Sequence, residues 1–255
     1  MSLAPESPVA AAVVPSPNHG ERAPGKRPDI LLLHYTGMPD EGEAVRWLAN
    51  PVSQVSAHYV VLEDGRVIQM VPEARRAWHA GLSHWAGETD VNSRSIGIEI
   101  ANPGHDGGLP PFGEAQIAAT IALCRDICAR WRIPKHRVLA HSDVAPRRKR
   151  DPGELFPWER LAREGVGLWV PPAPIADGRF LAHGDGGPPV EALQAMLALY
   201  GYGVPLGGVY DEDTAFVVAA FQRHFRPARV DGVADASTIT TLRDLIRARD
   251  ELGEA

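Results

Sequence analysis

The hydrophobic and polar positions in the first two thirds of the chain alternate between strand-like and helix-like patterns. Residues 29–36 read DILLLHYT. A short run with four consecutive apolar residues is typical of a strand buried on both faces. Residues 95–101, SIGIEIA, alternate apolar side chains around Glu99 and indicate a second strand. Two β-rich runs on either side of an Asp-Gly pair predict a hairpin over residues 58–71.

The clearest helical pattern covers residues 114–131. Apolar residues recur along one stripe, which predicts a helix with one buried face. Cys124 and Cys128 lie on this stripe four residues apart, so their Cβ atoms point the same way and a disulfide is geometrically disfavoured. We expect two buried thiols rather than a metal or redox pair. The run EGEAVRWLAN predicts a shorter amphipathic helix, and residues 138–140 a short strand.

Changes in composition divide the chain into four segments. Residues 1–28 are rich in Ala, Pro, Ser and Val, and we expect a disordered leader because prolines interrupt the apolar patch. Residues 29–169 carry the α/β pattern. Residues 170–188 are rich in Pro and Gly and indicate a linker. Residues 189–250 contain three helical segments, and the echoing turns GVYDEDT and GVADAST each place an aspartate at a helix N-cap.

Overall charge and hydropathy exclude several classes of protein. The 26 basic and 32 acidic residues leave a net charge of -6, which gives no compositional case for nucleic-acid binding. No apolar run approaches the roughly 20 residues that a membrane-spanning helix needs. The N-terminal segment lacks the basic start of a secretory signal, and neither cysteine lies where a lipid anchor would attach. We therefore expect a soluble monomer in the cytoplasm, with the periplasm or cell envelope as the alternative.

Residues 140–153, AHSDVAPRRKRDPG, concentrate the candidate chemistry. His141 and Asp151 supply an imidazole and a carboxylate, and Lys149 is one of four consecutive cations between them. Such a loop can hold two metal ligands, and a cation beside a metal suits the stabilisation of a developing oxyanion. Taken alone, this stretch is equally consistent with a solvated basic loop and a capping aspartate.

Other candidates lie at the ends of predicted elements. His34 ends the first strand, where a histidine is either a metal ligand or a satisfied core residue, and His58 at the hairpin start has the same two interpretations. Glu99 lies among isoleucines, where burial without a partner suits a carboxyl to act as a general base. A strand with one wet face is the alternative for Glu99. The loop AWHAGLSHWAG, with Trp78 and His79, has the aromatic and imidazole content of a sugar-binding surface.

His34, His141 and Asp151 come from separate elements at or near strand ends, where the loops of a sheet converge. Two histidines and one carboxylate with an open fourth position make a catalytic zinc site. In such a site Glu99 would accept a proton from water and pass it to the leaving nitrogen, and Lys149 would stabilise the tetrahedral oxyanion. The residues therefore predict metal-assisted amide hydrolysis, although ligands so far apart in sequence form no short motif.

Five stretches carry a resemblance to a known family: LLLHYTG, AHYVV, AWHAGLSHW, SIGIEIANPGH and HSDVAPRRKRDPGELFPW. In this order they resemble the zinc N-acetylmuramoyl-L-alanine amidases of the AmpD and AmiD type, which are related to peptidoglycan recognition proteins and phage amidase lysozymes. The resemblance runs from about residue 29 to residue 169. It implies a mixed β-sheet flanked by helices and cleavage of the amide between the lactyl group of N-acetylmuramic acid and L-alanine.

The resemblance also implies a cofactor, Zn²⁺, and individual residue roles. The residues that match the zinc ligands are His34, His141 and Asp151. Those that match catalytic positions are Glu99 and Lys149. In the phage and animal branches a tyrosine precedes the histidine that matches His58, but here that position is Ala57, so the base role is assigned to Glu99. The substrate-binding candidates are Tyr35, His58, Trp78, His79 and Asn102.

The C-terminal segment resembles a three-helix peptidoglycan-binding domain, from VEALQAMLALYGY to VDGVADASTITTL. The expected partners are peptidoglycan or anhydro-muropeptides, and such a domain would raise the effective concentration of polymeric substrate. Two other functions were weighed: a catalytically silent peptidoglycan receptor that uses the same groove, and a zinc peptidase that cuts within the stem peptide. The complete ligand set disfavours the first, and the motif order disfavours the second.

Overall fold

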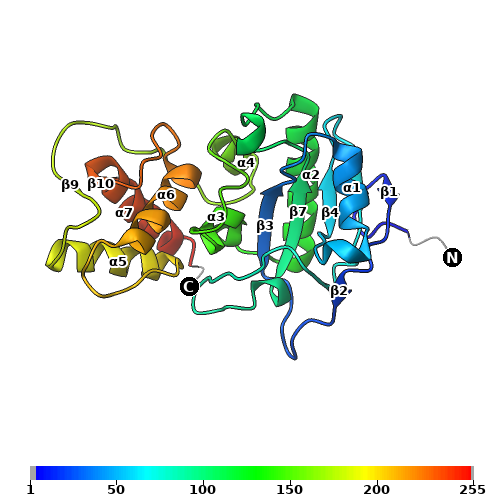
Figure 1. Cartoon of the computed structure of the whole chain (residues 1–255), viewed down its shortest axis with the longest axis horizontal. Helices are drawn as coiled ribbons and strands as arrows, with labels where there is room; N and C mark the ends of the chain where they lie inside the picture. The colour runs from blue at the N-terminus through cyan, green and yellow to red at the C-terminus, as the bar shows by residue number, and fades with distance from the viewer. Residues whose placement is uncertain (1–3, 254–255) are drawn as a thin grey trace.

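The computed structural model describes residues 4–253, which form two lobes (Figure 1). The larger lobe is built on a six-stranded sheet whose strands are β1 (Ala12–Val13), β3 (Ile30–Tyr35), β4 (Tyr59–Val61), β5 (Val67–Gln69), β7 (Ser95–Ile100) and β8 (Val138–Ala140). Their spatial order is β1-β5-β4-β7-β3-β8. The sheet is mixed, because β4, β7, β3 and β8 run parallel whereas β5 is antiparallel to β4.

Helices cover the sheet and build the smaller lobe. Those of the larger lobe are α1 (Glu41–Leu48), α2 (Glu114–Trp131), α3 (His141–Val144) and α4 (Trp158–Arg163). Those of the smaller lobe are α5 (Pro188–Tyr200), α6 (Glu212–Phe225) and α7 (Ala236–Glu251). Short 3₁₀ turns cover Pro51–Ser53, Val91–Ser93, His105–Gly107 and Lys135–Arg137. The predicted mixed α/β fold with a three-helix C-terminal unit is confirmed. No helix of the described residues is long and apolar enough to cross a membrane.

The strand β3 is buried on both faces, as its apolar run predicts. Leu31 and Leu33 belong to the cluster that contains the buried stripe of α2. Ile30 and Leu32 point the other way and join a cluster that includes α5, α6 and α7. Because side chains alternate along a strand, His34 continues this second face. The central strand therefore directs His34 to the side of the sheet on which the smaller lobe packs.

The helix α2 has the predicted boundaries. It ends at Trp131, and the capping residue Arg132 adopts the left-handed conformation two residues before Pro134. Its cysteines are free thiols, with Cys124 buried and Cys128 partly buried. Burial raises the pKa of Cys128 to about 12 and that of Cys124 well above its usual range. Both thiols are core residues, as predicted.

The prediction of a disordered leader is wrong for residues 4–28. The strand β1 runs beside β5 at the sheet edge, and β2 (His19–Gly20) pairs with β6 (Arg76–Ala77). Ser16 Oγ donates to the carbonyl of Leu48 at 2.5 Å, and Asn18 Nδ2 donates to the carbonyl of Asn50 at 2.8 Å. The prolines are compatible with this order because an edge strand leaves one side of its backbone unpaired. Residues 1–3 of this segment lie outside the described part of the chain.

Residues 170–188, predicted as a linker, attach to the smaller lobe at two places. The Ala173 N–H donates to Thr241 Oγ1 at 3.0 Å, and Ser237 Oγ donates to the Ala173 carbonyl at 2.6 Å. Farther along, β9 (Phe180–Leu181) pairs antiparallel with β10 (Ala234–Asp235). The segment is therefore held against α7 and its N-terminal turn.

The two lobes share a hydrophobic cluster. Trp85 is 2% exposed, and its ring centroid lies 5.0 Å from that of Tyr202 and 5.9 Å from that of Tyr200. On α6, His224 stacks on Trp158 with ring centroids 3.8 Å apart. The second half of the aromatic loop, which the sequence predicts as a binding surface, thus packs between the lobes instead.

A buried carboxylate connects α3 to the smaller lobe. Asp143 Oδ1 accepts a hydrogen bond from Tyr202 OH at 2.7 Å, and Asp143 Oδ2 lies 2.7 Å from His224 Nδ1. The same oxygen accepts from the Ala140 N–H at 2.8 Å. Figure 1 shows α3 between the sheet and the three helices. The smaller lobe therefore holds the short helix that begins at His141.

Candidate active site

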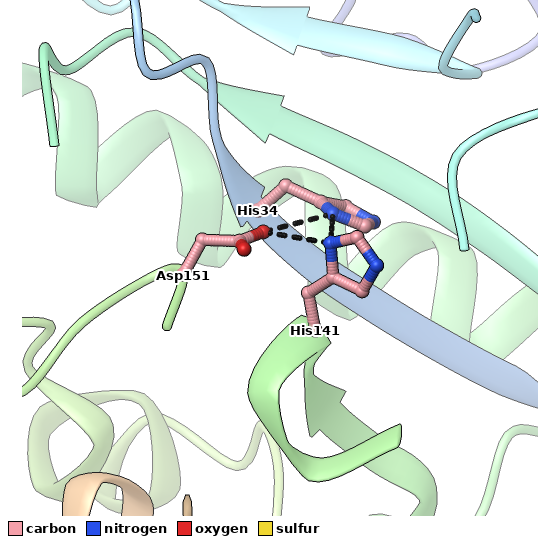
Figure 2. Close-up of side chains that lie close together, drawn as sticks. All are labelled: His34, His141 and Asp151. Atoms are coloured by element: carbon pink, nitrogen blue, oxygen red, sulfur yellow. Dashed lines mark hydrogen bonds and ion pairs between the residues drawn. The ribbon is translucent and has the colours of Figure 1, made fainter. Parts of the chain in front are cut away.

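Three side chains converge at the end of the sheet that faces α3 (Figure 2). His34 Nδ1 lies 2.8 Å from His141 Nδ1 and 3.1 Å from Asp151 Oδ2, and His141 Nδ1 lies 3.0 Å from the same carboxylate oxygen. All three residues are buried, with 1%, 3% and 5% exposure for His34, His141 and Asp151. The structure thus brings together the three predicted ligands, and they could hold a metal ion.

Parallel pairing of two neighbouring strands accounts for this convergence. In the register of β3 and β8, Leu33 lies opposite Ala140. The next residue of each strand is a histidine, so His34 and His141 leave the same edge of the sheet side by side. The Ser142 N–H donates to the Asp151 carbonyl at 3.0 Å, which closes the intervening loop and returns Asp151 to the histidines.

A backbone carbonyl sets the tautomer of His141. Its Nε2 lies 3.0 Å from the carbonyl oxygen of Ala80, which can only accept a hydrogen bond. In the neutral ring Nε2 therefore carries the proton, and Nδ1 directs a lone pair at the cluster. Metal-bound histidines generally have such an outer partner, which fixes the orientation of the ring.

A chain of three side chains sets the tautomer of His34. Ser95 Oγ donates to the Val91 carbonyl at 2.7 Å, so it is free to accept from His79 Nε2 at 3.3 Å. His79 Nδ1 is then the acceptor for His34 Nε2, 3.1 Å away, which leaves the His34 Nδ1 lone pair facing the cluster. Glycine is required at position 97, because a Cβ there would lie 2.5 Å from the His79 ring.

The donor set fits a divalent cation such as zinc. Two imidazole lone pairs and a carboxylate oxygen repel one another at these distances unless a positive charge lies between them. Burial, followed by the neighbouring His141, lowers the pKa of His34 to about 4, which keeps this ring neutral at physiological pH. Neutral imidazoles and an ionised carboxylate are the forms that bind metals.

Glu99 lies beside the cluster with an unsatisfied oxygen. In the register of β3 and β7 it is directly opposite His34. Its Oε2 is shielded from solvent and has no hydrogen-bond partner among the described residues. Burial raises the pKa of Glu99 well above its usual range, and the negative charge of Asp151 adds to this whereas Lys149 opposes it. An unpartnered carboxyl in a cavity is a group poised for proton transfer.

A cavity of about 300 Å³ opens onto the cluster and reaches α1. Glu99 and Lys149 line it together with the three candidate ligands. Among the predicted substrate-binding residues, those in its wall are Tyr35, Trp78 and His79. No sequence pattern pointed to two further lining residues, the exposed Trp47 and Val55, which add apolar surface to the cavity wall.

Two predicted substrate-binding residues form hydrogen bonds within the fold. His58 is 0% exposed, and its Nδ1 accepts a hydrogen bond from the Gly97 N–H at 2.9 Å. Asn102 is 4% exposed; its amide donates to the Pro110 carbonyl at 2.9 Å and its Oδ1 accepts from the Gly104 N–H at 2.8 Å. Neither residue lines the catalytic cavity. The contacts of His58 are those of a satisfied core histidine, which is its alternative interpretation.

The arginines that flank Lys149 are not freely solvated. Arg147 forms ion pairs with Glu212 and Asp213 of α6, each at 2.5 Å. Arg148 donates to the Ala80 carbonyl at 3.1 Å and to the Leu82 carbonyl at 2.5 Å. Arg150 lies 3.3 Å from Asp106. Arg148 thus supports the same Ala80 carbonyl that orients His141, a role that the sequence pattern did not reveal because a carbonyl has no residue signature.

Comparison with known proteins decides the family. Residues 24–154 match the sequence profile described as N-acetylmuramoyl-L-alanine amidase, and residues 186–242 match that of a peptidoglycan binding domain. The chain is 41% identical over 223 residues to the N-acetylmuramoyl-L-alanine amidase AmiD of Escherichia coli K12, covering 82% of this chain and 79% of the relative. The chain belongs to the N-acetylmuramoyl-L-alanine amidase family. The predicted family and class of enzyme are thus confirmed.

Other relatives of this amidase agree in fold and sequence. The 1,6-anhydro-N-acetylmuramyl-L-alanine amidase AmpD of Enterobacter cloacae is 34% identical over 170 residues, covering 60% of this chain and 89% of the relative. The structure of E. coli AmiD with anhydro-N-acetylmuramic acid-L-Ala-D-γ-Glu-L-Lys matches with a TM-score of 0.73 and 38% identity, over 92% of this amidase and 94% of that chain. That of AmpDh3 from Pseudomonas aeruginosa with anhydromuramic pentapeptide matches with a TM-score of 0.75 and 34% identity, over 89% and 93%.

Proposed function

We propose that this chain is a zinc hydrolase that cleaves the amide between N-acetylmuramic acid, or its 1,6-anhydro form, and L-alanine of peptidoglycan or muropeptides. The observation that carries the proposal is the convergence of His34, His141 and Asp151 beside the unpartnered Oε2 of Glu99. In this proposal the three converging residues hold zinc, and residues 29–169 form the catalytic domain. Zinc, when bound, supplies a Lewis acid for the scissile carbonyl and the attacking water.

Glu99 is the proposed general base. Its free Oε2 accepts a proton from the attacking water, and the raised pKa of its carboxyl favours delivery of that proton to the departing nitrogen of L-alanine. One group can serve both steps because the carboxyl holds the proton between attack on the carbonyl and departure of the amine.

Lys149 is the proposed electrophilic residue. It lines the same cavity as the three converging residues, and in this proposal its ammonium group faces the carbonyl oxygen on which negative charge develops. Arg148 and Arg150 flank it in sequence, but their side chains contact Leu82 and Asp106. Among the cations of this loop, Lys149 is thus the one that stabilises the tetrahedral oxyanion.

The relatives support a muropeptide substrate. The matching AmiD and AmpDh3 structures hold anhydromuramic peptides, and the cavity walls provide Trp78 and Tyr35 as flat surfaces for a sugar ring. Residues 189–250 are the proposed peptidoglycan-binding domain, which retains polymeric substrate near the catalytic cavity. Tyr202 and His224 of this domain contact Asp143, so its position relative to the site is fixed.

Incubation of the purified protein with defined muropeptides tests this function. We expect release of the free stem peptide, loss of release after chelation, and recovery when zinc is added back, each followed by mass spectrometry. Intact sacculi assayed in parallel show whether polymer or fragment is preferred. Uncut muropeptide that remains bound to the protein would favour a silent receptor, and cleavage within the peptide would favour a peptidase.

A further inference from the structure

Two consecutive loop residues bind the outer nitrogens of both candidate zinc histidines. His34 Nε2 lies 3.1 Å from His79 Nδ1, and His141 Nε2 lies 3.0 Å from the Ala80 carbonyl oxygen. Residues 78–80 follow β6 and belong to no helix or strand. Because this loop lies outside the regular hydrogen-bond ladders, the position of the two acceptors depends on its other contacts.

A single amide oxygen holds the backbone of both loop residues. Asn92 Oδ1 accepts a hydrogen bond from the His79 N–H at 3.1 Å and another from the Ala80 N–H at 2.9 Å. Two N–H donors directed at one atom identify it as the oxygen of the side-chain amide, because the amide nitrogen cannot accept. Asn92 is 6% exposed, so water does not readily replace an acceptor that is lost here.

The turn that carries Asn92 is itself firmly held. It is the 3₁₀ turn Val91–Ser93, and the Asp90 side chain caps it by accepting from the N–H of its last residue at 3.3 Å. From the N-terminal segment, Arg22 Nη1 donates to the Asn92 carbonyl at 3.1 Å and to the Ser95 carbonyl at 3.0 Å. Asn92 therefore has a fixed position from which its side chain can fix the loop.

We propose that Asn92 is a positioning residue of the amidase, which holds the outer partners of both zinc histidines and thereby sets the affinity of the site for the metal. This inference rests on the proposed function, because that function includes the zinc ion. Asn92 does not line the catalytic cavity, so it acts through His79 and Ala80. Outer partners fix the tautomer and the orientation of a ligating imidazole. Since one oxygen serves both partners, its loss affects both rings together.

Two substitutions at this position separate the oxygen from the volume of the side chain. Asn92→Leu has a similar size but offers no acceptor, whereas Asn92→Asp keeps an oxygen for the two N–H groups and has the Arg22 guanidinium at the same turn to offset its charge. We expect the zinc Kd of Asn92→Leu to be about tenfold higher than that of the wild type, the lower end of the range for loss of an outer partner. Asn92→Asp should recover most of that affinity. Competition with a chromophoric zinc chelator measures each Kd.

The chain contains a matched control in the smaller lobe. Gln222 is 0% exposed, and its Oε1 accepts from the consecutive N–H groups of Asp231 and Gly232 at 3.0 Å and 2.9 Å. Gln222→Met thus removes the same kind of buried acceptor from a loop that contacts neither zinc histidine. We expect this variant to lower the thermal unfolding temperature and to leave the zinc Kd unchanged. The comparison distinguishes a general loss of stability from a loss of positioning.

The outcomes separate the positioning role from the function. An unchanged zinc Kd in Asn92→Leu, equal weakening in Asn92→Asp, or equal weakening in Gln222→Met overturns the positioning role while the amidase activity stands. If Asn92→Leu does not fold, Asn92→Ala takes its place in the same comparison.

A wild type that binds no zinc would contradict the metal in the proposed function. The ¹⁵N chemical shifts of His34 and His141 in the metal-free protein then decide the positioning role. Nε2–H tautomers in the wild type and a mixture of tautomers in Asn92→Leu support it, and identical tautomers in both proteins overturn it.

Discussion

Glu73 and Glu99 are glutamates of the same lobe with opposite surroundings. Glu73 is 1% exposed and is surrounded by donors: Tyr59 OH at 2.6 Å and Arg130 Nη2 at 2.6 Å on Oε1, and Trp131 Nε1 at 2.5 Å on Oε2. Glu99 has an oxygen that is shielded from solvent and without a partner. Burial opposes ionisation of Glu73, yet its donors lower its pKa, whereas burial raises the pKa of Glu99.

The difference separates a structural carboxylate from a functional one. Glu73 joins the end of α2 to β4 and has no capacity left for chemistry, because each of its oxygens is already engaged. Glu99 has an oxygen that takes part in no hydrogen bond and is therefore available to a proton. Because the hydrogen bonds of Glu73 are satisfied, replacing it should lower stability. Because an oxygen of Glu99 has no partner, replacing it should lower activity instead.

Replacing Glu99 should give the largest effect. We expect Glu99→Gln to lower kcat by about a hundredfold to ten-thousandfold, the usual contribution of a general base. Zinc content should be unchanged, because Glu99 is not one of the three converging ligands. Stability at neutral pH should be equal or higher, because a buried carboxyl whose ionisation is disfavoured in the folded state is replaced by a neutral side chain. Turnover, bound metal and thermal unfolding measured on one preparation check this. Loss of metal in the variant would show that Glu99 is a ligand, which would contradict its role as the general base.

The sequence revealed features that depend on local pattern. The limits of α2 follow from one apolar stripe and a terminal proline, and the N-caps at Asp211 and Asp235 follow from turn sequences. The pattern also allowed three site residues to be predicted, because each lies at or near the end of an apolar strand: His34, His141 and Glu99. Pairing of these strands as parallel neighbours then brought them together.

Features that depend on partners distant in the sequence could not be predicted from the sequence. Glu73 lies in a charged stretch without periodicity, and its donors come from residues up to 58 positions away. The contact between Tyr202 and Asp143 spans 59 positions. The hydrophobic pattern of each of the two segments gives no indication that they meet. For the same reason residues 4–28 looked disordered: their order comes from the sheet edge and from backbone carbonyls elsewhere, not from their own periodicity.

Replacing Glu73 should have an intermediate effect, on stability. Glu73→Gln keeps the shape but removes the charge that pairs with Arg130. We expect a loss of about 2–3 kcal/mol, slightly below that for a fully buried pair, because Arg130 is 34% exposed and keeps Asp126 as a partner. Urea unfolding measures this loss at pH 7. Activity per folded molecule should not change; a fall in kcat would place Glu73 in the catalytic pathway.

The stability loss should depend on pH with a defined sign. The folded-state pKa of Glu73 is lower than its unfolded value, so its contribution is present above the unfolded pKa of about 4.3. It disappears as the pH falls through the lower folded-state pKa. The difference between wild type and Glu73→Gln should therefore be constant from about pH 6 upward and shrink below about pH 4. A difference that grows on acidification would contradict the lowered pKa.

The smallest expected effect comes from removing one donor from Glu73 while leaving its charge paired. Tyr59→Phe deletes the hydroxyl that donates to Oε1 at 2.6 Å, but Arg130 Nη2 still donates to that oxygen. We expect a loss of about 1.5 kcal/mol, the lower end of the range for a hydrogen bond to a charged group, because the acceptor oxygen keeps another donor. In the Glu73→Gln background the same change should have a smaller effect, because the acceptor is then neutral. A double-mutant cycle measures this coupling, and additive losses would show that Glu73 acts through packing rather than through its charge.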